Sequence, residues 1–331
     1  MSAPSTDVIA IGNAIVDVMA PASEDDIVRL GLAKGGMTLV DEARAHELYD
    51  AMGPAREISG GSAANTLAGL AALGAKCAFI GQVAQDQLGE VFAHDIRAGG
   101  ISFATPSRAG QPATARCLIF VTPDGQRTMN TFLGASQFLP ASQLDEAAIA
   151  DAAVLYLEGY LWDPEEPRAA MRRAIAAARN AGRKVAFTLS DAFVIARHGD
   201  DFRSLIDAGA IDILFANEHE LAALTGIEDF HEGIAHLGGK VPTVVVTRSE
   251  KGAYAIRNGE HAEVPAQPIA KVVDTTGAGD LFAAGFLFGQ VRALPLAQCL
   301  RLGAICAAEI ISHYGARPEA DLKALVADAV K

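Results

Sequence analysis

Basic side chains are scarce in this sequence. Its 331 residues include 27 lysines and arginines against 40 aspartates and glutamates, which gives a formal net charge of −13. Such a charge disfavours binding to nucleic acid or to an anionic membrane surface. Any phosphate group that this protein binds must therefore be held by local backbone amides, a metal ion and a few basic residues.

Long apolar segments are also missing. The longest uncharged stretch, residues 58–75, is interrupted by glycines and by polar residues, so it is a poor membrane span. Residues 1–7 contain no basic region followed by an apolar stretch, and we therefore expect no signal peptide. Half of all residues are hydrophobic, which is enough for a large core in one or two domains.

The four cysteines show no CxxC pair and no grouping with histidine of the zinc-binding type. Cys299 and Cys306 are spaced so that they could share a helix face. The simpler interpretation is that all four are small buried apolar residues in a reducing compartment. We therefore expect a cytoplasmic protein.

Two common phosphate-binding motifs are absent, because GxxxxGK[ST] occurs nowhere and no GxGxxG follows a strand. The best anion site is DTTGAGD at residues 274–280, just before an apolar segment, 281–288, that predicts a helix. Free N–H groups and the positive end of the helix dipole would face an anion there. Asp280 could simply cap this helix. Beside a phosphate its charge would be repulsive, unless it accepts the proton of an attacking hydroxyl group.

From about residue 60 onward, short apolar runs alternate with helical patterns. Buried strands that alternate with helices predict a mostly parallel sheet covered on both faces. The expected strands are residues 76–80, 153–157, 184–189, 212–216 and 243–247, and the expected helices are residues 62–73, 165–180, 218–224 and 296–313.

Two parts of the chain break this alternation. Residues 114–121 and 127–132 flank Pro-Asp-Gly at 123–125, which is a strong signal for an antiparallel hairpin. Residues 8–11 and 37–40 also look like strands, without a convincing crossover helix between them. A small β layer built from two separated segments would lie over the strand ends as a lid.

Asn217 and Glu220 follow the predicted strand 212–216. They would lie at the carboxyl end of that strand, where open α/β sheets bind ligands. Residues three apart share a helix face, so both side chains could point at one magnesium ion or its waters. The same pair could equally be a capping box and nothing more.

Two further groups contain residues suited to binding hydroxyl groups. Gly60 and Gly61 precede a predicted helix and would let a ligand approach the backbone closely, and Asn65, one turn further on, can both donate and accept. A glycine loop before a core helix explains this pattern equally well. Asp17 follows the strand 8–11 and could bind two vicinal hydroxyls, or it could be a solvated turn residue.

These four groups occur in the order and spacing of the PfkB, or ribokinase-like, family of carbohydrate and nucleoside kinases. The sequence resembles this family over essentially its whole length. The two signature regions are residues 60–89 (GGSAANTLAGLAALGAKCAFIGQVAQDQLG) and residues 274–285 (DTTGAGDLFAAG). The second signature is highly specific.

Within that family the sequence looks most like the adenosine kinases. The segments that carry this likeness are GNAIVDVMA at 12–20, TLSDAF at 188–193, DILFANEHE at 212–220 and the lid strand at 127–135. Two segments depart from that group's pattern, Met37-Thr38 and the GYLW at 159–162. These departures leave the base preference open.

The resemblance implies an α/β, ribokinase-like three-layer fold with a mostly parallel central sheet and a small β-sheet lid. Residues 1–331 would form a single kinase domain, with the lid built from about residues 12–45 and 105–135. The implied activity is transfer of the γ-phosphate of ATP to the 5′-hydroxyl of a nucleoside, with adenosine as the expected acceptor in purine salvage. The alternative within the family is a sugar kinase of the ribokinase or fructokinase type. A non-catalytic sensor on the same fold is disfavoured, because a sensor has no need of Asp280.

The resemblance also implies roles for particular residues. Asp280 would be the catalytic base, assisted by the amides of Gly277, Ala278 and Gly279. The residues implied in acceptor binding are Asn13, Asp17, Gly60, Gly61, Ser62, Asn65, Met129, Thr131, Leu133 and Tyr160, with an added aromatic contact from Phe193. Those implied in ATP binding are Asn217, Thr247, Ser249, Gly252, Gly277 and Gly279.

The implied cofactors are Mg²⁺, held by Asn217 and Glu220 through water, ATP as co-substrate, and a monovalent cation such as K⁺ bordered by Asp274 and Thr276. Arg127 would reach the phosphates when the lid closes. The expected partners are a small nucleoside or sugar and ATP, with neither nucleic acid nor membrane. A homodimer is left open.

Overall fold

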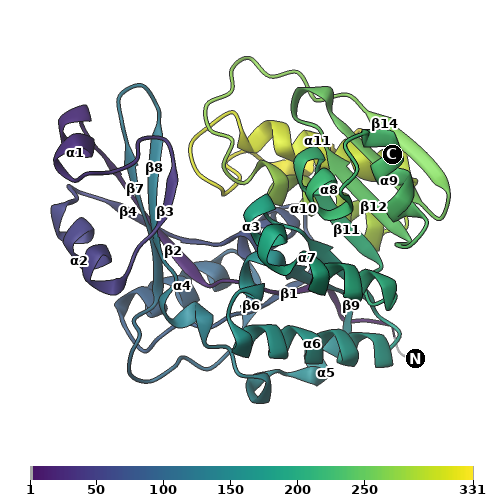
Figure 1. Ribbon diagram of the computed structural model, residues 1–331, viewed down its shortest axis with the longest axis horizontal. Coiled ribbons are helices and arrows are strands. Elements are labelled where there is room, and N and C mark those ends of the chain that lie inside the picture. Colours follow the sequence, from purple (N-terminus) through teal and green to yellow (C-terminus); the bar gives the residue numbers. More distant parts are fainter. Residues whose placement is uncertain (1–2, 331) are drawn as a thin grey trace.

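A nine-stranded sheet runs through the larger part of the molecule, a computed structural model that describes residues 3–330 (Figure 1). In spatial order the strands are β14 (Glu260–Val264), β13 (Ala253–Arg257), β12 (Thr243–Thr247), β11 (Ile213–Asn217), β10 (Lys184–Thr188), β9 (Ala152–Glu158), β1 (Thr6–Ile11), β5 (Cys77–Ile80) and β6 (Ile101–Phe103). In this order all neighbouring strands from β12 to β6 are parallel, and β13 and β14 join antiparallel at one edge.

Helices cover both faces of this sheet and enclose two hydrophobic cores. Alternate residues of β1 point to opposite faces, so Val8 belongs to one core and Ile9 to the other. The first core contains side chains of α3 (Ser62–Ala72), α4 (Gln87–Ala98), α10 (Ala278–Val291), α11 (Leu296–Ile310) and α12 (Leu322–Val326). The second contains side chains of α5 (Glu146–Ala150), α6 (Glu165–Asn180), α7 (Ala192–Asp207), α8 (Glu218–Thr225) and α9 (Phe230–Gly238). The predicted three-layer α/β fold is confirmed.

A second, smaller sheet of five strands stands apart from the first (Figure 1). Its strands, in order, are β3 (Met37–Leu39), β8 (Arg127–Phe132), β7 (Ala115–Val121), β2 (Ile15–Pro21) and β4 (Arg56–Gly60). The predicted hairpin is confirmed, because β7 and β8 pair antiparallel. Helices α1 (Glu24–Arg29) and α2 (Glu42–Ala51) place buried side chains in the same core as Val16 and Phe120, on the outer face of this sheet.

The second sheet extends beyond the two segments from which we predicted it. Its edge strand β4 lies outside residues 12–45 and 105–135, and it pairs antiparallel with β2, with Ile15 opposite Gly60. The sequence of β4, REISG, has only one large apolar residue and gives no strand signal of its own. Pairing with β2 therefore decides its conformation. The predicted strand 8–11 belongs instead to the central sheet, as β1.

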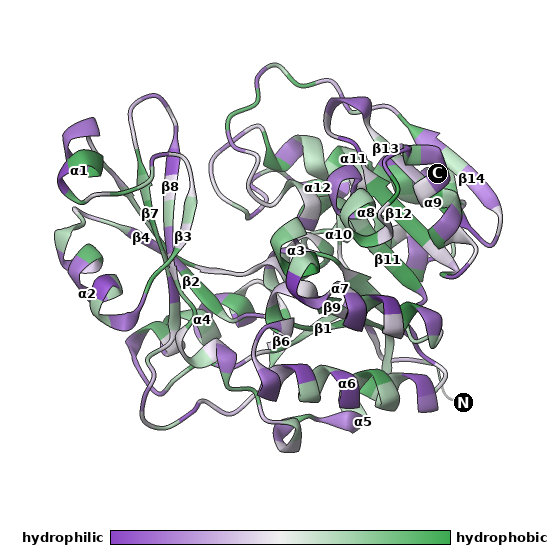
Figure 2. Ribbon diagram, viewed as in Figure 1, coloured by the Kyte–Doolittle hydropathy of each residue, from purple (hydrophilic) through white to green (hydrophobic). Residues whose placement is uncertain are grey.

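Hydropathy follows this architecture. Figure 2 shows hydrophobic residues concentrated in the central strands and in α10, which is buried from Leu281 to Gly289. The outer helix α6 buries only one side. No helix within residues 3–330 combines the length and the apolar composition that crossing a bilayer requires. The four cysteines are buried and free, as expected. Short 3₁₀ segments complete the fold, namely η1 (Gly134–Gln137), η2 (Ala141–Gln143), η3 (Gly159–Trp162) and η4 (Ser249–Lys251).

Candidate active site

The DTTGAGD segment forms a turn with free amides at the start of α10. Gly277 precedes the helix with φ 78°, a left-handed conformation that favours glycine. The amide of Ala278 donates to the Thr275 carbonyl at 3.2 Å. In the part of the chain that the structure describes, the amides of Gly279 and Asp280 have no hydrogen-bond acceptor. Together with the helix dipole, these amides form an anion site.

Asp280 lies in the first turn of α10 and is held by two residues of α3. Ser62 Oγ donates to its Oδ1 at 2.6 Å, and Asn65 Nδ2 donates to its Oδ2 at 3.0 Å. Burial raises the pKa of Asp280, while these two hydrogen bonds and the charge of Arg317 lower it. The carboxylate is therefore oriented on both oxygens and lies beside the anion site.

A cavity of about 730 Å³ extends from this turn to the inner face of the second sheet. Asp17 and Asn65 lie in its wall together with Asp280. Within residues 3–330, the carboxylate of Asp17 and the buried Oδ1 of Asn65 bind no partner. Burial raises the pKa of Asp17 to about 6, against the effect of Arg127 and Arg317. Both groups are free to bind hydroxyls of a ligand.

Asn13 also borders the cavity, but its side chain is already engaged. Its Nδ2 donates to Glu158 Oε1 at 2.7 Å, and its Oδ1 accepts from Ser136 Oγ at 2.8 Å. The acceptor-binding role of Asn13 stays a prediction, and in this structure its side chain joins Glu158 to Ser136. Gly60 lies against Asp17, since a Cβ there would be 2.5 Å from Asp17 Oδ2. Gly61 has φ 94° and would place a Cβ 2.2 Å from the Asn13 carbonyl oxygen.

The inner face of the second sheet forms an apolar wall of this cavity. Tyr160 and Phe193 stand beside each other on the large body, with ring centroids 6.0 Å apart, and both border the same cavity. Besides the predicted Met129, Thr131 and Leu133, the sheet contributes Met37, Leu39, Cys117 and Ile119. Sequence reasoning did not single out Leu39, Cys117 or Ile119. The last two lie on β7, whose alternate residues are buried on the other face, so the strand gives no sign of which residues face the cavity.

Asn217 and Glu220 lie at the carboxyl end of β11 and border the cavity. They form a capping box: Asn217 Nδ2 donates to Glu220 Oε1 at 2.7 Å, and the Glu220 amide donates back to Asn217 Oδ1 at 2.9 Å. Burial raises the pKa of Glu220 to about 7. No cluster of three His, Cys, Asp or Glu side chains able to hold a metal occurs within residues 3–330. The pair thus provides one carboxylate and one amide oxygen beside the anion site.

Of the three residues predicted to lie near the ATP base and ribose, only one borders the cavity. Thr247, at the end of β12, lies in the cavity wall, whereas Ser249 and Gly252 do not. They form the tight turn between β12 and β13, where the Gly252 amide donates to the Ser249 carbonyl at 3.1 Å. At Gly252, φ is 90° and a Cβ would lie 2.0 Å from the Val264 carbonyl oxygen.

Arg127 and Asp274 form a buried ion pair between the second sheet and the anion turn. Asp274 also accepts the amides of Thr276 at 3.0 Å and Gly315 at 3.0 Å. The arginine predicted to reach the phosphates is thus bound to a carboxylate in this structure. The aspartate predicted to border a monovalent cation has both oxygens engaged in hydrogen bonds.

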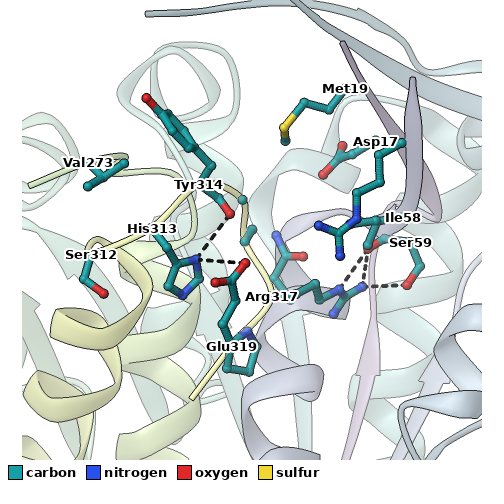
Figure 3. A pocket seen from close by; sticks show the side chains of 15 residues that line it. Asp17, Met19, Ile58, Ser59, Val273, Ser312, His313, Tyr314, Arg317 and Glu319 are labelled. Atoms are coloured by element: carbon teal, nitrogen blue, oxygen red, sulfur yellow. Dashed lines mark hydrogen bonds and ion pairs between the residues drawn. The ribbon is translucent and has the colours of Figure 1, made fainter. Parts of the chain in front are cut away.

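A second cavity, of about 530 Å³, adjoins the first and shares Asp17 and Asn65 with it. It lies between the β2–β4 edge of the second sheet and the segment after α11 (Figure 3). In this cavity Arg317 binds backbone oxygens, with Nε donating to the Ser59 carbonyl at 2.9 Å. Sequence reasoning gave no signal for Arg317.

A cradle of helix amides, a carboxylate beside it and a cavity between two sheets define a small-molecule phosphotransferase of the α/β class. The chain belongs to the pfkB family of carbohydrate kinases, whose sequence profile matches residues 26–322. It is therefore a kinase.

Two solved structures resemble the whole chain. The adenosine kinase of Sinorhizobium meliloti is 46% identical with a TM-score of 0.90, and the match covers 98% of this chain and 99% of that one. A probable sugar kinase of Rhizobium etli CFN 42 is 43% identical with a TM-score of 0.91, and covers 99% of each chain. The fructokinase of Klebsiella pneumoniae is 28% identical over 292 residues, which are 85% of this chain and 95% of that protein.

Proposed function

We propose that this kinase transfers the γ-phosphate of ATP to the 5′-hydroxyl of a nucleoside, with adenosine as the preferred acceptor. The observation that carries this proposal is the contrast between two parts of one cavity. Unpartnered polar groups of Asp17 and Asn65 lie near Asp280, and an apolar wall with Met129 and Leu133 lies across from the large body. A nucleoside has a polar ribose and an apolar base face, which match these two parts.

In the proposed reaction Asp280 accepts the proton of the acceptor hydroxyl. The oxygen then forms a bond to the γ-phosphorus, the bond from that phosphorus to the bridging oxygen breaks, and ADP leaves. The free amides at Gly279 and Asp280 stabilise charge on the transferring group. Ser62 and Asn65 keep the carboxylate oriented toward the hydroxyl. Asp17 and Asn65 bind the ribose hydroxyls.

For magnesium, the residues that fit are Glu220 and Asn217. Mg²⁺ is commonly bound by one or two carboxylates together with phosphate oxygens and retained waters, and Glu220 with Asn217 offers such a minimal donor set. We propose that these two residues hold Mg²⁺ through water, where the ion would neutralise phosphate charge. A monovalent cation at Asp274 would have to share its oxygens with Arg127 and two backbone amides, which donate to them in this structure.

We further propose that residues 1–331 act as one kinase unit with the second sheet as its lid. The ion pair of Arg127 with Asp274 supports this, since it joins the sheet to the anion turn.

The alternative acceptor is a sugar such as ribose or fructose. The likeness to the Rhizobium etli probable sugar kinase favours this alternative nearly as much as the Sinorhizobium meliloti adenosine kinase favours a nucleoside. The polar part of the cavity would serve either acceptor. Only the apolar wall discriminates between them.

A variant of that wall tests the proposal. Met129→Gln places a polar group where the base would lie, so kcat/KM for adenosine should fall about 10-fold. The kcat/KM for ribose should not change, because a bare sugar does not reach the wall. Val28→Gln is the matched control, since Val28 is 80% exposed on α1, outside the cavity. Equal losses for adenosine and ribose would contradict the assignment of the wall to the base.

A further inference from the structure

The amino end of α3 has no cap of its own. The preceding Gly61 offers no side chain, so the first amides of the helix need acceptors from elsewhere. Glu158, the last residue of β9, provides one: its Oε2 accepts the Ala63 amide at 2.7 Å. Its other oxygen accepts the Asn13 amide at 2.8 Å. Glu158 therefore joins the loop after β1 to the start of α3.

Glu158 is fully buried and forms no ion pair within residues 3–330. A buried carboxylate without a cation is costly unless it is hydrogen-bonded. Three N–H donors and the positive end of the α3 dipole offset that cost. The chain also leaves space for it at Gly12, where a Cβ would lie 2.6 Å from Glu158 Oε2.

Arg317 holds the next residue of α3 from the opposite direction. Its Nη1 donates to the Ala64 carbonyl at 2.7 Å, and its Nε donates to the Ser59 carbonyl at 2.9 Å. Figure 3 shows this guanidinium directed at Ser59 from the segment after α11. Residues 63 and 64 are thus bound by an anion on one side and a cation on the other.

The turn that these two residues hold is the one that binds Asp280. Ser62 and Asn65 lie immediately before and after residues 63 and 64, and each donates to one oxygen of the Asp280 carboxylate. Helix α3 is also packed closely on α10, because a Cβ at Gly69 would lie 2.5 Å from Leu281 Cδ1. A small shift of the first turn of α3 would therefore misplace both donors.

We propose that Glu158 and Arg317 are positioning residues for Asp280, which hold the first turn of α3 so that Ser62 and Asn65 orient the carboxylate. The inference rests on the role of Asp280 in the proposed function. Glu158 borders the cavity that contains Asp280, but both of its carboxylate oxygens already accept hydrogen bonds from the protein. The guanidinium of Arg317 likewise donates to backbone carbonyls.

The two residues differ in charge, which makes the proposal testable by pH. Arg317 favours the ionised form of Asp280. Burial raises the pKa of Glu158 to about 7, so Glu158 is protonated at lower pH and adds no charge there. Within residues 3–330, five charged or titratable groups interact electrostatically with Asp280. They are Asp17 of β2, Tyr156 and Glu158 of β9, Tyr160 of η3 and Arg317. Removing the cation should raise the pKa of Asp280, whereas replacing the protonated Glu158 should leave it unchanged.

The experiment measures kcat against pH for Glu158→Gln and Arg317→Met, with saturating Mg-ATP and the best acceptor found. Glutamine would turn an amide group toward the Ala63 N–H, so we expect kcat to fall up to about 100-fold. The acid limb of the profile should move to higher pH in Arg317→Met and stay in place in Glu158→Gln. The KM for ATP should stay within about threefold of wild type in both variants.

Arg257→Met is the matched control. Arg257 also donates to a backbone carbonyl, that of Leu294 at 3.1 Å, but it lies on β13, outside the cavity that contains Asp280. Its acid limb should not move. If either primary variant fails to fold, Glu158→Asp or Arg317→Lys replaces it. These keep the charge but shorten or reshape the contact, so kcat should fall with the limb unmoved.

An acid limb that stays in place in Arg317→Met would overturn the inference, as would kcat values within twofold of wild type in Glu158→Gln and Arg317→Met. Asp280→Asn is assayed in parallel to separate the two levels of the argument. If Asp280→Asn retains its turnover, the proposed base itself is wrong. If Asp280→Asn is inactive and the two variants behave like wild type, only the positioning roles are wrong.

Discussion

Arg127 of the second sheet and Asp274 of the anion turn form an ion pair in which each side chain is only 6% exposed. A second contact between the hairpin and the large body lies nearby. Gly125, in the β7–β8 turn, packs so closely on Tyr314 that a Cβ there would lie 2.7 Å from the tyrosine hydroxyl. The hairpin is therefore docked on the large body beside the anion turn. Asp274 connects the two, since it also accepts the Thr276 amide.

Removing one partner of this pair should leave an uncompensated buried charge. We expect Arg127→Met and Asp274→Asn each to lower the free energy of unfolding by about 3–5 kcal/mol. The double variant should lose less than the sum of the two, because it leaves no isolated charge. Urea unfolding of the four proteins measures this coupling, and strict additivity would show that the pair does not interact.

Asp280→Asn should keep the fold and bind both substrates while losing turnover. General-base assistance is worth about 10²–10⁴-fold in rate, and asparagine cannot accept the proton. Steady-state kinetics give kcat, and calorimetric titration with the acceptor gives its affinity. A variant with near-normal kcat would remove Asp280 from the chemistry.

Asp17→Ala should weaken acceptor binding far more than ATP binding. A lost hydrogen bond to a charged group costs about 1.5–3 kcal/mol, and Asp17 has no other partner within residues 3–330. For the same reason 2′-deoxyadenosine should be a poorer substrate than adenosine for the wild-type enzyme. Equal kcat/KM values for the two nucleosides would place Asp17 outside the ribose site.

Stability of the ligand-free protein should fall as the pH rises toward neutrality. Burial raises the pKa of Glu158 and of Glu220 from 4.5 to about 7. Between those values the folded protein binds more protons than the unfolded chain, so the free energy of unfolding decreases with rising pH. Glu220→Gln should reduce this slope, whereas Glu260→Gln, at an exposed edge position, should not. A stability that increases from pH 4.5 to 7 in wild type would contradict this account.

Much of the fold could be predicted from apolar patterns. The helix at 165–180 and the strands at 127–132 and 243–247 are confirmed with the same bounds. The strand β14 was missed because its sequence, EHAEV, is polar and lies at the sheet edge. Its conformation comes from pairing with β13. Local pattern alone does not contain that information.

The candidate site likewise contains residues that the sequence indicates and residues that it does not. The anion turn, Asp280 and the residues proposed to bind the acceptor occur in recognisable local motifs, so the sequence could indicate them. Glu158 and Arg317 belong to no such motif, and their partners lie far along the chain: 145 residues separate Asn13 from Glu158. One signal was available for Glu158, a carboxylate at the end of the buried run 153–157, where α/β sheets place functional groups.

The most direct test of the central claim is kcat/KM for adenosine against ribose and fructose, with inosine and guanosine included, at one fixed Mg-ATP concentration with coupled detection of ADP. The apolar wall of Met129 and Leu133 should favour a purine by several kcal/mol, at ~25 cal/mol per Å² of buried apolar surface. We therefore predict that adenosine exceeds both sugars by a wide margin. A sugar that equals or outruns adenosine would contradict the nucleoside assignment and establish the sugar-kinase alternative.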